Sequence, residues 1–306
     1  MNTSGPSQPV ALVGGTGNLG RLVAHALLDR GADLQLLVRP ESRARAADLE
    51  SRGATVVEGT LGAGDERALA DLLAGADAVV SAVQGGPDVL VDGQLRLLGA
   101  AREAGVGRLV PSDYSFDFFR LAEGANPNSD WRRQFASAAA EARGGVEVVH
   151  VLNGCFLDRR VLFGFLGAID LERGVLHLWG DGAEPMDLTT YADTAAYTAE
   201  VALDGDPVPR VFGVAGDVVD VPGLVRAYQE GSGTSLRVEE RGSLGDLDAL
   251  IAARQREAPE NLYAYLPLMY WRAMLNGEGK IESLQNERYP SVRPTDVATY
   301  VAREGL

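Results

Sequence analysis

Short apolar segments alternate with amphipathic segments through the first half of the chain. The amphipathic segments carry apolar residues three and four positions apart, which is the spacing of one helix face. This pattern predicts helices over residues 19–30, 65–73, 89–104 and 130–143. Between them it predicts strands over residues 9–13, 34–38, 54–58, 78–83, 108–111 and 146–152. Strands that alternate with helices in this way indicate an α/β fold, a doubly wound parallel sheet covered on both faces.

The pattern is less regular after residue 152. It predicts a strand over residues 175–179, helices over 190–203, 222–230 and 244–258, and a candidate seventh strand over 211–215. Residues 262–275 are apolar on nearly every face and are interrupted by Pro267, which indicates a buried, broken helix. We therefore expect a flexible tail (1–8), a sheet domain (9–155, with returns from about 187–215) and a mainly smaller C-terminal α+β cap (156–306).

The composition is that of a globular protein, with 306 residues of which 46% are hydrophobic and 23% are charged. The net charge of −15 opposes binding to nucleic acid or to anionic membranes, because both require a basic surface. No apolar run reaches the roughly 18 residues that a membrane span needs, and no signal-peptide pattern opens the chain.

Two residue types are scarce enough to matter. Cys155 is the single cysteine, so we expect no internal disulfide and a reducing, cytoplasmic location. The three histidines show no ligand spacing with one another or with Cys155, so no metal site is expected. Lys280 is the single lysine, and nearly all positive charge is arginine.

Three glycines stand three residues apart between the first predicted strand and the first predicted helix. This is the context that a dinucleotide-binding turn requires. Gly14 permits a tight turn, Gly17 lets the backbone approach a pyrophosphate, and Gly20 permits close helix–sheet packing. The free N–H groups at the helix start can then bind phosphate. We therefore predict a Rossmann-type nucleotide site formed by Gly14, Thr16, Gly17, Asn18, Leu19 and Gly20. The alternative is a packing turn that binds no nucleotide.

The residue after the second predicted strand points to the type of nucleotide. NAD-preferring sites place an acidic residue about 20 positions beyond the glycines, whereas this chain has Arg39 there. A guanidinium group can pair with the 2′-phosphate of NADP, which a carboxylate would repel. The sequence therefore favours NADP(H) over NAD(H). Arg43 and Arg45 could add to this pairing, although both also fit a solvated surface.

Several further segments carry a resemblance to a known family. They are Leu37-Val38-Arg39-Pro40, Val80-Ser81-Ala82-Val83, Arg108-Leu109-Val110-Pro111-Ser112-Asp113-Tyr114, Asn153-Gly154-Cys155-Phe156 and residues 192–198. With the glycine turn, their order and spacing resemble the NmrA-like and isoflavone-reductase-like group of atypical short-chain dehydrogenases. The resemblance covers about residues 10–203 and, more loosely, the remainder. It implies cofactor contacts from Ala82, Val83, Pro111, Ser112, Asn153, Cys155 and Phe156.

The chain departs from the family's reductases at the lysine that they carry on the helix after the Pro-Ser segment. The aligned position is near Arg133, which could hold an anionic substrate or steady an oxyanion, or could be a solvated helix arginine. Tyr114 could donate a proton if its pKa is lowered, or could be a packed aromatic with a bonded hydroxyl. Asp113 could orient Arg133, act as an acid or base, or cap a turn. His150 is expected to be a satisfied core histidine.

The resemblance implies three possible functions. The first is an NADPH-dependent reductase that transfers hydride to a hydrophobic, aromatic or enone-like small molecule. The second is a non-catalytic NADP(H) redox sensor that binds a partner protein, which the missing lysine favours. The third is a lyase, isomerase or cyclase on a reused reductase scaffold. Aromatic residues could line an apolar substrate pocket, or could simply pack the core. The candidates for this pocket are Phe116, Trp131, Phe156 and Trp179.

Overall fold

The computed structural model describes residues 8–306, which fall into two compact units. Unit 1 contains the chain up to Tyr114, then 131–151 and 194–212. Unit 2 contains 115–130, 152–193 and 213–306. Residues 115–130, which we expected in the sheet domain, are therefore part of unit 2, because they pack into its core through Phe116 and Leu121. The expected tail lies outside the described residues except for Gln8, whose side-chain amide donates to the Leu203 carbonyl at 3.1 Å.

Unit 1 is built on a six-stranded sheet in the order β3-β2-β1-β4-β5-β6, with every pair parallel. The strands are β1 (Pro9–Val13), β2 (Asp33–Val38), β3 (Thr55–Glu58), β4 (Ala78–Ser81), β5 (Arg108–Val110) and β6 (Glu147–Val148). The strand order reverses between β1 and β4, which is the crevice where open α/β sheets bind ligands. The predicted fold class is confirmed.

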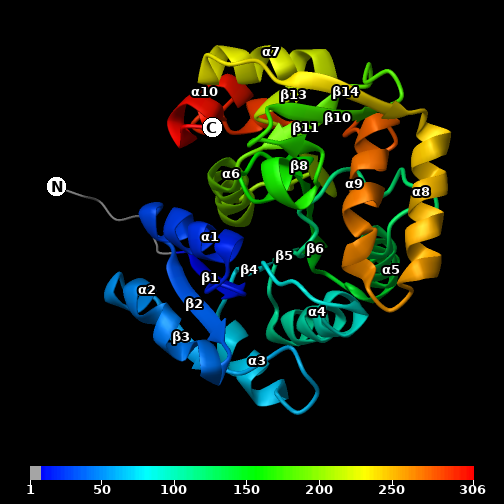
Figure 1. The fold of residues 1–306 in the computed structure, drawn as a ribbon. Coiled ribbons are helices and arrows are strands. Elements are labelled where there is room, and N and C mark those ends of the chain that lie inside the picture. Colours follow the sequence, from blue (N-terminus) through cyan, green and yellow to red (C-terminus); the bar gives the residue numbers. More distant parts are fainter. Residues whose placement is uncertain (1–7) are drawn as a thin grey trace. The chain divides into compact units, whose positions relative to one another are not determined.

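Helices cover both faces of this sheet (Figure 1). They are α1 (Asn18–Asp29), α2 (Ala47–Ser51), α3 (Glu66–Leu73), α4 (Gln94–Ala104), most of α5 (Pro127–Ala142) and most of α6 (Tyr191–Leu203). A 3-10 segment (Pro40–Ala46) precedes α2, and a π-helical turn (Asp88–Gly93) precedes α4. Helix α1 buries Leu19, Val23 and Leu27 at the predicted spacing. Because helices pack on both sides, β4 and β5 are buried along their whole length.

The predicted sixth strand is divided in two. After β6 the chain leaves the sheet and forms β7 (His150–Leu152), whose partner is β12 (Val211–Gly213). The Val149 N–H still donates to Leu109 of β5 at 2.9 Å, whereas the His150 N–H donates to Arg210 at 2.8 Å. The candidate seventh strand thus exists, but it pairs with β7 and not with the main sheet.

Unit 2 combines short sheets with helices. One sheet has the order β14-β10-β9 and another the order β13-β11-β8. Their strands are β8 (Cys155–Phe156), β9 (Ile169–Asp170), β10 (Val175–Trp179), β11 (Met186–Thr189), β13 (Asp217–Val219) and β14 (Arg237–Gly242). The helices are α7 (Val221–Ser232), α8 (Leu244–Glu257), α9 (Leu266–Leu275) and α10 (Val297–Glu304). Shorter helical turns are a π-helical turn at Val161–Phe165 and 3-10 turns at Leu262–Ala264 and Asn286–Arg288. Pro267 occupies the first turn of α9, where its missing N–H leaves no helix bond unmade, so the break precedes it.

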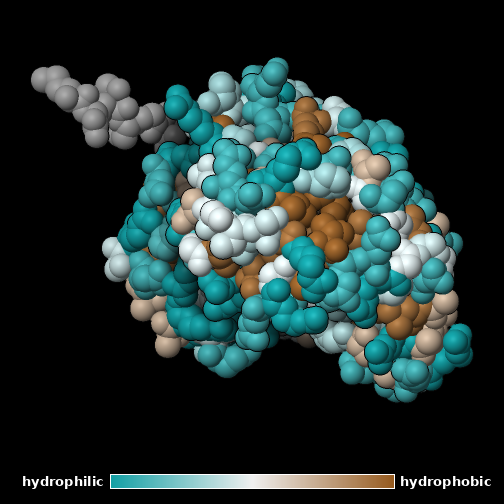
Figure 2. Space-filling model, turned by 45° about the horizontal axis from the view of Figure 1, so that its top comes forward, coloured by the Kyte–Doolittle hydropathy of each residue, from teal (hydrophilic) through white to brown (hydrophobic). Residues whose placement is uncertain are grey.

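The face of the molecule drawn in Figure 2 is mostly hydrophilic, with hydrophobic areas between polar ones. The large hydrophobic side chains that are exposed all belong to unit 2. They are Val218, Val238, Tyr263 and Leu284. Among residues 8–306, no helix combines the length and apolarity that crossing a bilayer would require.

Candidate functional site

The glycine turn of unit 1 joins β1 to α1. Gly14 has φ +84°, and a Cβ there would overlap the Ala82 carbonyl oxygen. A Cβ on Gly20 would overlap the Gly14 carbonyl oxygen, so close packing of α1 on the turn requires both glycines. Gly17 differs, because its φ of −83° and ψ of 176° suit any residue, and the nearest atom to a Cβ would be the Gly14 oxygen at 3.3 Å. A side chain at position 17 would therefore crowd one backbone oxygen slightly, a much milder conflict than the overlaps at Gly14 and Gly20.

Gly17 is also the N-cap of α1, and no side chain caps this helix end. The N–H groups in the first turn of a helix lack intrahelical acceptors, and the positive end of the helix dipole lies there. Gly17 and Asn18 are exposed. This open turn has the geometry of an anion-binding site.

Arg39 follows β2 directly and is the N-cap residue of the 3-10 segment after it. Its guanidinium lies 3.3 Å from the Glu41 carboxylate, and its side chain is 62% exposed. Arg43, in contrast, holds Glu50 in a two-pronged ion pair at 2.5 and 2.6 Å. Arg39 therefore remains accessible to an incoming phosphate, whereas Arg43 is already paired with the Glu50 carboxylate.

Predicted cofactor residues meet at the carboxyl ends of β4 and β5. The Ser112 hydroxyl donates to the Val83 carbonyl at 2.7 Å, and the Ser112 N–H donates to the buried Gln94 side chain at 2.6 Å. Pro111 precedes Ser112, and Ala82 lies against Gly14. The Ser81 hydroxyl, at the end of β4, is fully buried and has no hydrogen-bond partner. Nearly all buried polar groups are paired, so an orphan here is consistent with a missing ligand.

The proposed catalytic residues of unit 1 are deeply buried. The Asp113 carboxylate, 0% exposed, lies 2.5 Å from the His150 ring nitrogen Nδ1, and His150 is 1% exposed. The second carboxylate oxygen of Asp113 has no hydrogen-bond partner among residues 8–306, so its observed side-chain partner is His150, and Arg133 lies half-buried on α5. Burial raises the pKa of the Tyr114 phenol far above its ordinary value, an effect that the Thr198 hydroxyl offsets only in part. The lowered pKa that acid catalysis by Tyr114 required is therefore not found.

In unit 2, Cys155 and Phe156 form β8. Cys155 is free, and burial raises the pKa of its thiol to about 12, so it is a packed apolar group and not a reactive thiolate. The Phe156 ring stacks on Tyr191 with a centroid distance of 3.9 Å and an interplanar angle of 13°.

Two of the aromatic residues predicted to line one pocket, Phe116 and Trp179, pack in or against the same hydrophobic cluster of unit 2. Phe116 packs on Tyr270, with ring centroids 5.3 Å apart. Trp179 packs at the edges of two hydrophobic clusters, one of which contains Phe116. Trp131 belongs to unit 1. Phe116 is thus packed in the core, whereas Trp131, Phe156 and Trp179 are half-buried and stay predicted pocket residues; Tyr270 also neighbours Phe165, with ring centroids 6.1 Å apart.

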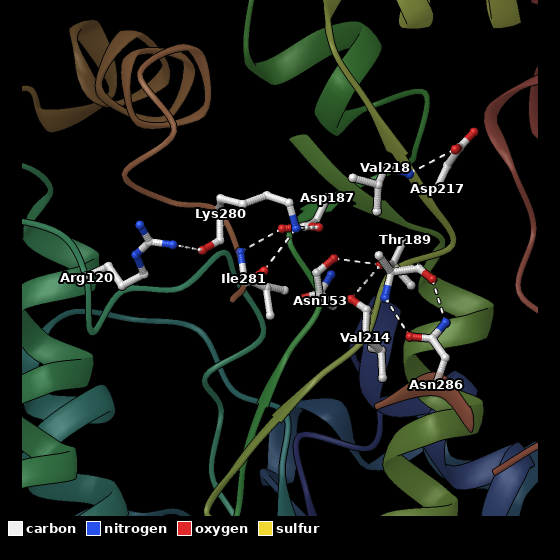
Figure 3. Close-up of polar contacts among 11 residues, drawn as sticks. Arg120, Asn153, Asp187, Thr189, Val214, Asp217, Val218, Lys280, Ile281 and Asn286 are labelled. Carbon is white, nitrogen blue, oxygen red and sulfur yellow. Dashed lines mark hydrogen bonds and ion pairs between the residues drawn. The ribbon is translucent and has the colours of Figure 1, made fainter. Parts of the chain in front are cut away.

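Sequence reasoning missed a polar group in unit 2 that we call the Lys280 cluster, formed by Lys280, Asp187 and Asn153 (Figure 3). The Lys280 ammonium donates to the Asp187 carboxylate at 2.5 Å and to the Ile281 carbonyl at 2.9 Å. Asn153 is fully buried, and neither its amide nitrogen nor its amide oxygen has a hydrogen-bond partner. The only sign of this cluster in the sequence was that Lys280 is the single lysine of the chain.

Comparison with known proteins relates the chain to one group of reductases. Residues 6–128 match the family model of the NmrA-like family. A bifunctional pinoresinol-lariciresinol reductase from Linum corymbulosum is 27% identical, with 99% of each chain covered. Pinoresinol reductase 2 from Arabidopsis thaliana is 30% identical over 65% of this chain and 66% of that protein.

Solved structures share the fold over nearly the whole chain. An isoflavone reductase has a TM-score of 0.81 at 20% identity, with 97% of this chain and 99% of that chain covered. A structure described as AtPrR2 with NADP⁺ and (+)pinoresinol has a TM-score of 0.81 at 22% identity, with 98% and 99% covered.

Proposed function

Because this chain belongs to the NmrA-like, isoflavone-reductase-like family, we propose that it is an NADPH-dependent reductase of a hydrophobic, aromatic or enone-like small molecule. The observation that carries this proposal is the glycine turn. Packing requires Gly14 and Gly20 strictly but Gly17 much less, so a ligand that approaches the exposed backbone is the better explanation for the glycine at position 17. A packing turn that binds nothing would account for Gly14 and Gly20 more fully than for Gly17.

The residues of unit 1 fit NADP(H). The uncapped first turn of α1 would bind the pyrophosphate, and the exposed guanidinium of Arg39 would pair with the 2′-phosphate. When bound, the dinucleotide supplies the hydride, and the protein supplies position and electrostatics. Ala82, Val83, Pro111, Ser112, Asn153, Cys155 and Phe156 remain predicted cofactor contacts.

The names of similar proteins support an aromatic substrate. The matched relatives are reductases of the lignans pinoresinol and lariciresinol, and a neighbour of similar fold is an isoflavone reductase. The Linum relative matches over 99% of the chain, so the likeness includes unit 2 as well as the nucleotide-binding part. This favours the reductase over a redox sensor or a reused scaffold with another chemistry.

A calorimetric titration with NADPH, NADP⁺, NADH and NAD⁺ tests the cofactor. We expect NADPH and NADP⁺ to bind more tightly than NADH and NAD⁺. Arg39→Glu should weaken NADPH binding by about 10- to 100-fold, since hydrogen bonds to charged groups contribute roughly 1.5–3 kcal/mol, and should change NADH binding little. Arg67→Glu is the control, because it makes the same charge change at a side chain that is 94% exposed on α3.

Measurement of turnover then distinguishes the reductase from the redox sensor. Consumption of NADPH with (+)-pinoresinol, an isoflavone or a leucoanthocyanidin would support the reductase. Tight binding without turnover of any of them would favour the sensor, and no binding of any nucleotide would contradict both.

A further inference from the structure

The one ammonium side chain of this protein is held at a buried carboxylate. The sequence contains 28 positively charged side chains, of which only Lys280 is a lysine. Arginines such as Arg39 and Arg67 pair with exposed carboxylates, whereas the Asp187 side chain that binds Lys280 is 1% exposed. A buried carboxylate is costly unless it is paired, so Asp187 fixes where the ammonium lies.

Both oxygens of Asp187 are engaged by the same segment. One accepts from the Lys280 ammonium at 2.5 Å, and the other accepts from the Ile281 N–H at 2.8 Å. The ammonium also donates to the Ile281 carbonyl at 2.9 Å. An ammonium group has three donors, and within residues 8–306 only these two bonds use them. The Lys280 side chain is 21% exposed, so one N–H remains for a ligand.

A second observation in this part of unit 2 is a buried amide without hydrogen-bond partners among residues 8–306. Gly154, which follows Asn153, has φ +67°, and its α-carbon lies so close to Asp187 that a Cβ would overlap the Asp187 backbone. The Asn153 carbonyl accepts from the Thr189 hydroxyl at 2.7 Å (Figure 3). The Asn153 amide is left wholly without partners although it is buried. Each unsatisfied buried group costs roughly 1–3 kcal/mol, so such an amide is expected where ligand atoms complete its bonding.

Aromatic rings adjoin the same segment. Gly279, next to Lys280, lies against the Phe116 ring, and the Gly279 carbonyl accepts from the Asp117 N–H at 2.9 Å. Phe116 packs on Tyr270, whose hydroxyl accepts from the Asn128 amide at 3.1 Å. An ammonium on a segment that packs against aromatic rings suits a ligand that is apolar and aromatic but bears a phenolic, ether or carbonyl oxygen.

We propose that Lys280 is the proton donor of this reductase, positioned by Asp187, and that it acts on an oxygen atom of an aromatic substrate. This inference rests on the proposed function. As the substrate carbon accepts hydride and NADPH is oxidised to NADP⁺, negative charge develops on the substrate oxygen. The Lys280 Nζ–H bond breaks as the O–H bond forms, and in a benzylic ether the C–O bond breaks at the same time. The neutral amine then regains its proton from water, and Asp187 stabilises the restored ammonium.

The test compares three variants of the full-length protein. Lys280→Met removes the proton, and Lys280→Arg keeps the charge but is a poor proton donor. Arg120→Met is the matched control, because its guanidinium donates to the Lys280 carbonyl at 3.0 Å without reaching Asp187. Thermal unfolding and NADPH affinity of each variant are measured first, so that a folding defect is recognised.

We expect Lys280→Arg to fold and bind NADPH as the wild type does, but to lose about 100- to 10,000-fold in kcat, the usual contribution of general acid catalysis. The alkaline limb of the pH–kcat profile should disappear with it, whereas Arg120→Met should retain it. The charged groups around the ammonium are Asp187, Arg120 and Glu282, the last paired with Arg120 at 3.7 Å. Wild-type kcat and an unchanged profile in Lys280→Arg would overturn the proposal and leave Lys280 as an ion-pair anchor.

A second measurement works without turnover. Because Lys280 is the only lysine, reductive methylation with isotope-labelled formaldehyde places one side-chain probe, which Lys280→Arg lacks. We expect (+)-pinoresinol, added with NADP⁺, to shift the NMR signal of this probe. If the wild type binds NADPH but reduces no substrate, the proposed function fails, and the probe still decides whether an oxygenated aromatic ligand reaches Lys280. No shift with pinoresinol, an isoflavone or a leucoanthocyanidin would refute the Lys280 site.

Discussion

Each unit of this protein contains a fully buried carboxylate that pairs with a basic side chain, and these two pairs are built differently. In unit 1, Asp113 and His150 meet at 2.5 Å, and both are essentially inaccessible to water. In unit 2, Asp187 and Lys280 meet at the same distance, but the ammonium is 21% exposed and retains an unused donor. Unit 1 instead keeps its open donors on the backbone, at the uncapped start of α1.

The difference separates a structural pair from one that can take part in chemistry. A closed pair such as Asp113–His150 can hold a strand in place, but a substrate cannot reach it. A pair with an exposed donor can bind a further atom without breaking the first bond. Accessibility, more than the distance between partners, therefore decides which of the two can be catalytic.

Removing the basic partner should have the larger effect in unit 1. His150→Leu leaves Asp113 buried with no partner at all, and should lower the free energy of unfolding by roughly 3–5 kcal/mol. Lys280→Met leaves Asp187 its bond to the Ile281 N–H, and should cost roughly 1.5–3 kcal/mol. Urea unfolding at neutral pH measures both values. The double variant His150→Leu/Asp113→Asn should recover much of the unfolding free energy that His150→Leu loses. Equal losses in His150→Leu and Lys280→Met would contradict the comparison.

The glycine turn offers a second contrast, between the exposed backbone at Gly17 and the closely packed backbone at Gly20. Gly17→Val should lower the thermal stability of the protein much less than Gly20→Ala does, but should weaken NADPH binding at least 100-fold, about 2.7 kcal/mol, because the side chain would occupy the space of the pyrophosphate. Calorimetry with NADPH and a thermal scan measure the two effects.

Gly20→Ala is the companion variant, because its Cβ would overlap the Gly14 oxygen and should destabilise the fold itself. Unchanged NADPH affinity in Gly17→Val would argue against the phosphate site.

The smallest expected effect is a dependence on pH. Burial raises the pKa of Asp187 above its ordinary value, and the Lys280 ammonium partly offsets this. The folded state therefore binds the Asp187 proton up to a higher pH than the unfolded state does. The stability that this bound proton contributes is lost as the pH rises through the folded-state pKa of Asp187. Lys280→Met should raise that pKa further, and its unfolding free energy should fall with pH above about 4 by at most about 1.4 kcal/mol per pH unit.

The double variant Lys280→Met/Asp187→Asn removes the titrating group and is the control. Urea unfolding between pH 4 and 8, read as the difference between the single and the double variant, isolates Asp187. A difference that stays constant across this range would show that the pKa of Asp187 does not depend on Lys280.

Much of unit 1 could be predicted because the sequence patterns that identify its strands, helices and glycine turn are local. The glycine turn lies within Gly14–Gly20, and strands β1, β2 and β4 are continuous apolar runs between helices with a clear buried face. These patterns require only near neighbours in the sequence. The break between β6 and β7 was missed because residues 146–152 form one apolar run, and only the change of partner from Leu109 to Arg210 divides it.

Unit 2 resisted prediction because its contacts are distant in sequence. Strand β14 is mostly exposed and reads as polar, so no alternation identifies it. The Lys280 cluster joins residues 153, 187 and 280, and no local pattern connects them. Arg133, a nearby arginine, was one candidate partner of Asp113, whereas the partner that the structure shows, His150, is 37 residues away. Such choices depend on packing, which the sequence pattern does not contain.

The course of the chain between the units bears on how the protein is made. Unit 1 is not complete until Phe212 has been synthesised, although its glycine turn emerges first and residues 152–193 of unit 2 come before its last helix. Domains usually fold as units while the ribosome is still adding residues. Here a ribosome that stalls before residue 212 would carry a nascent chain with an unfinished sheet domain. We expect such chains to depend on chaperones, and neither unit to be obtainable by simple truncation.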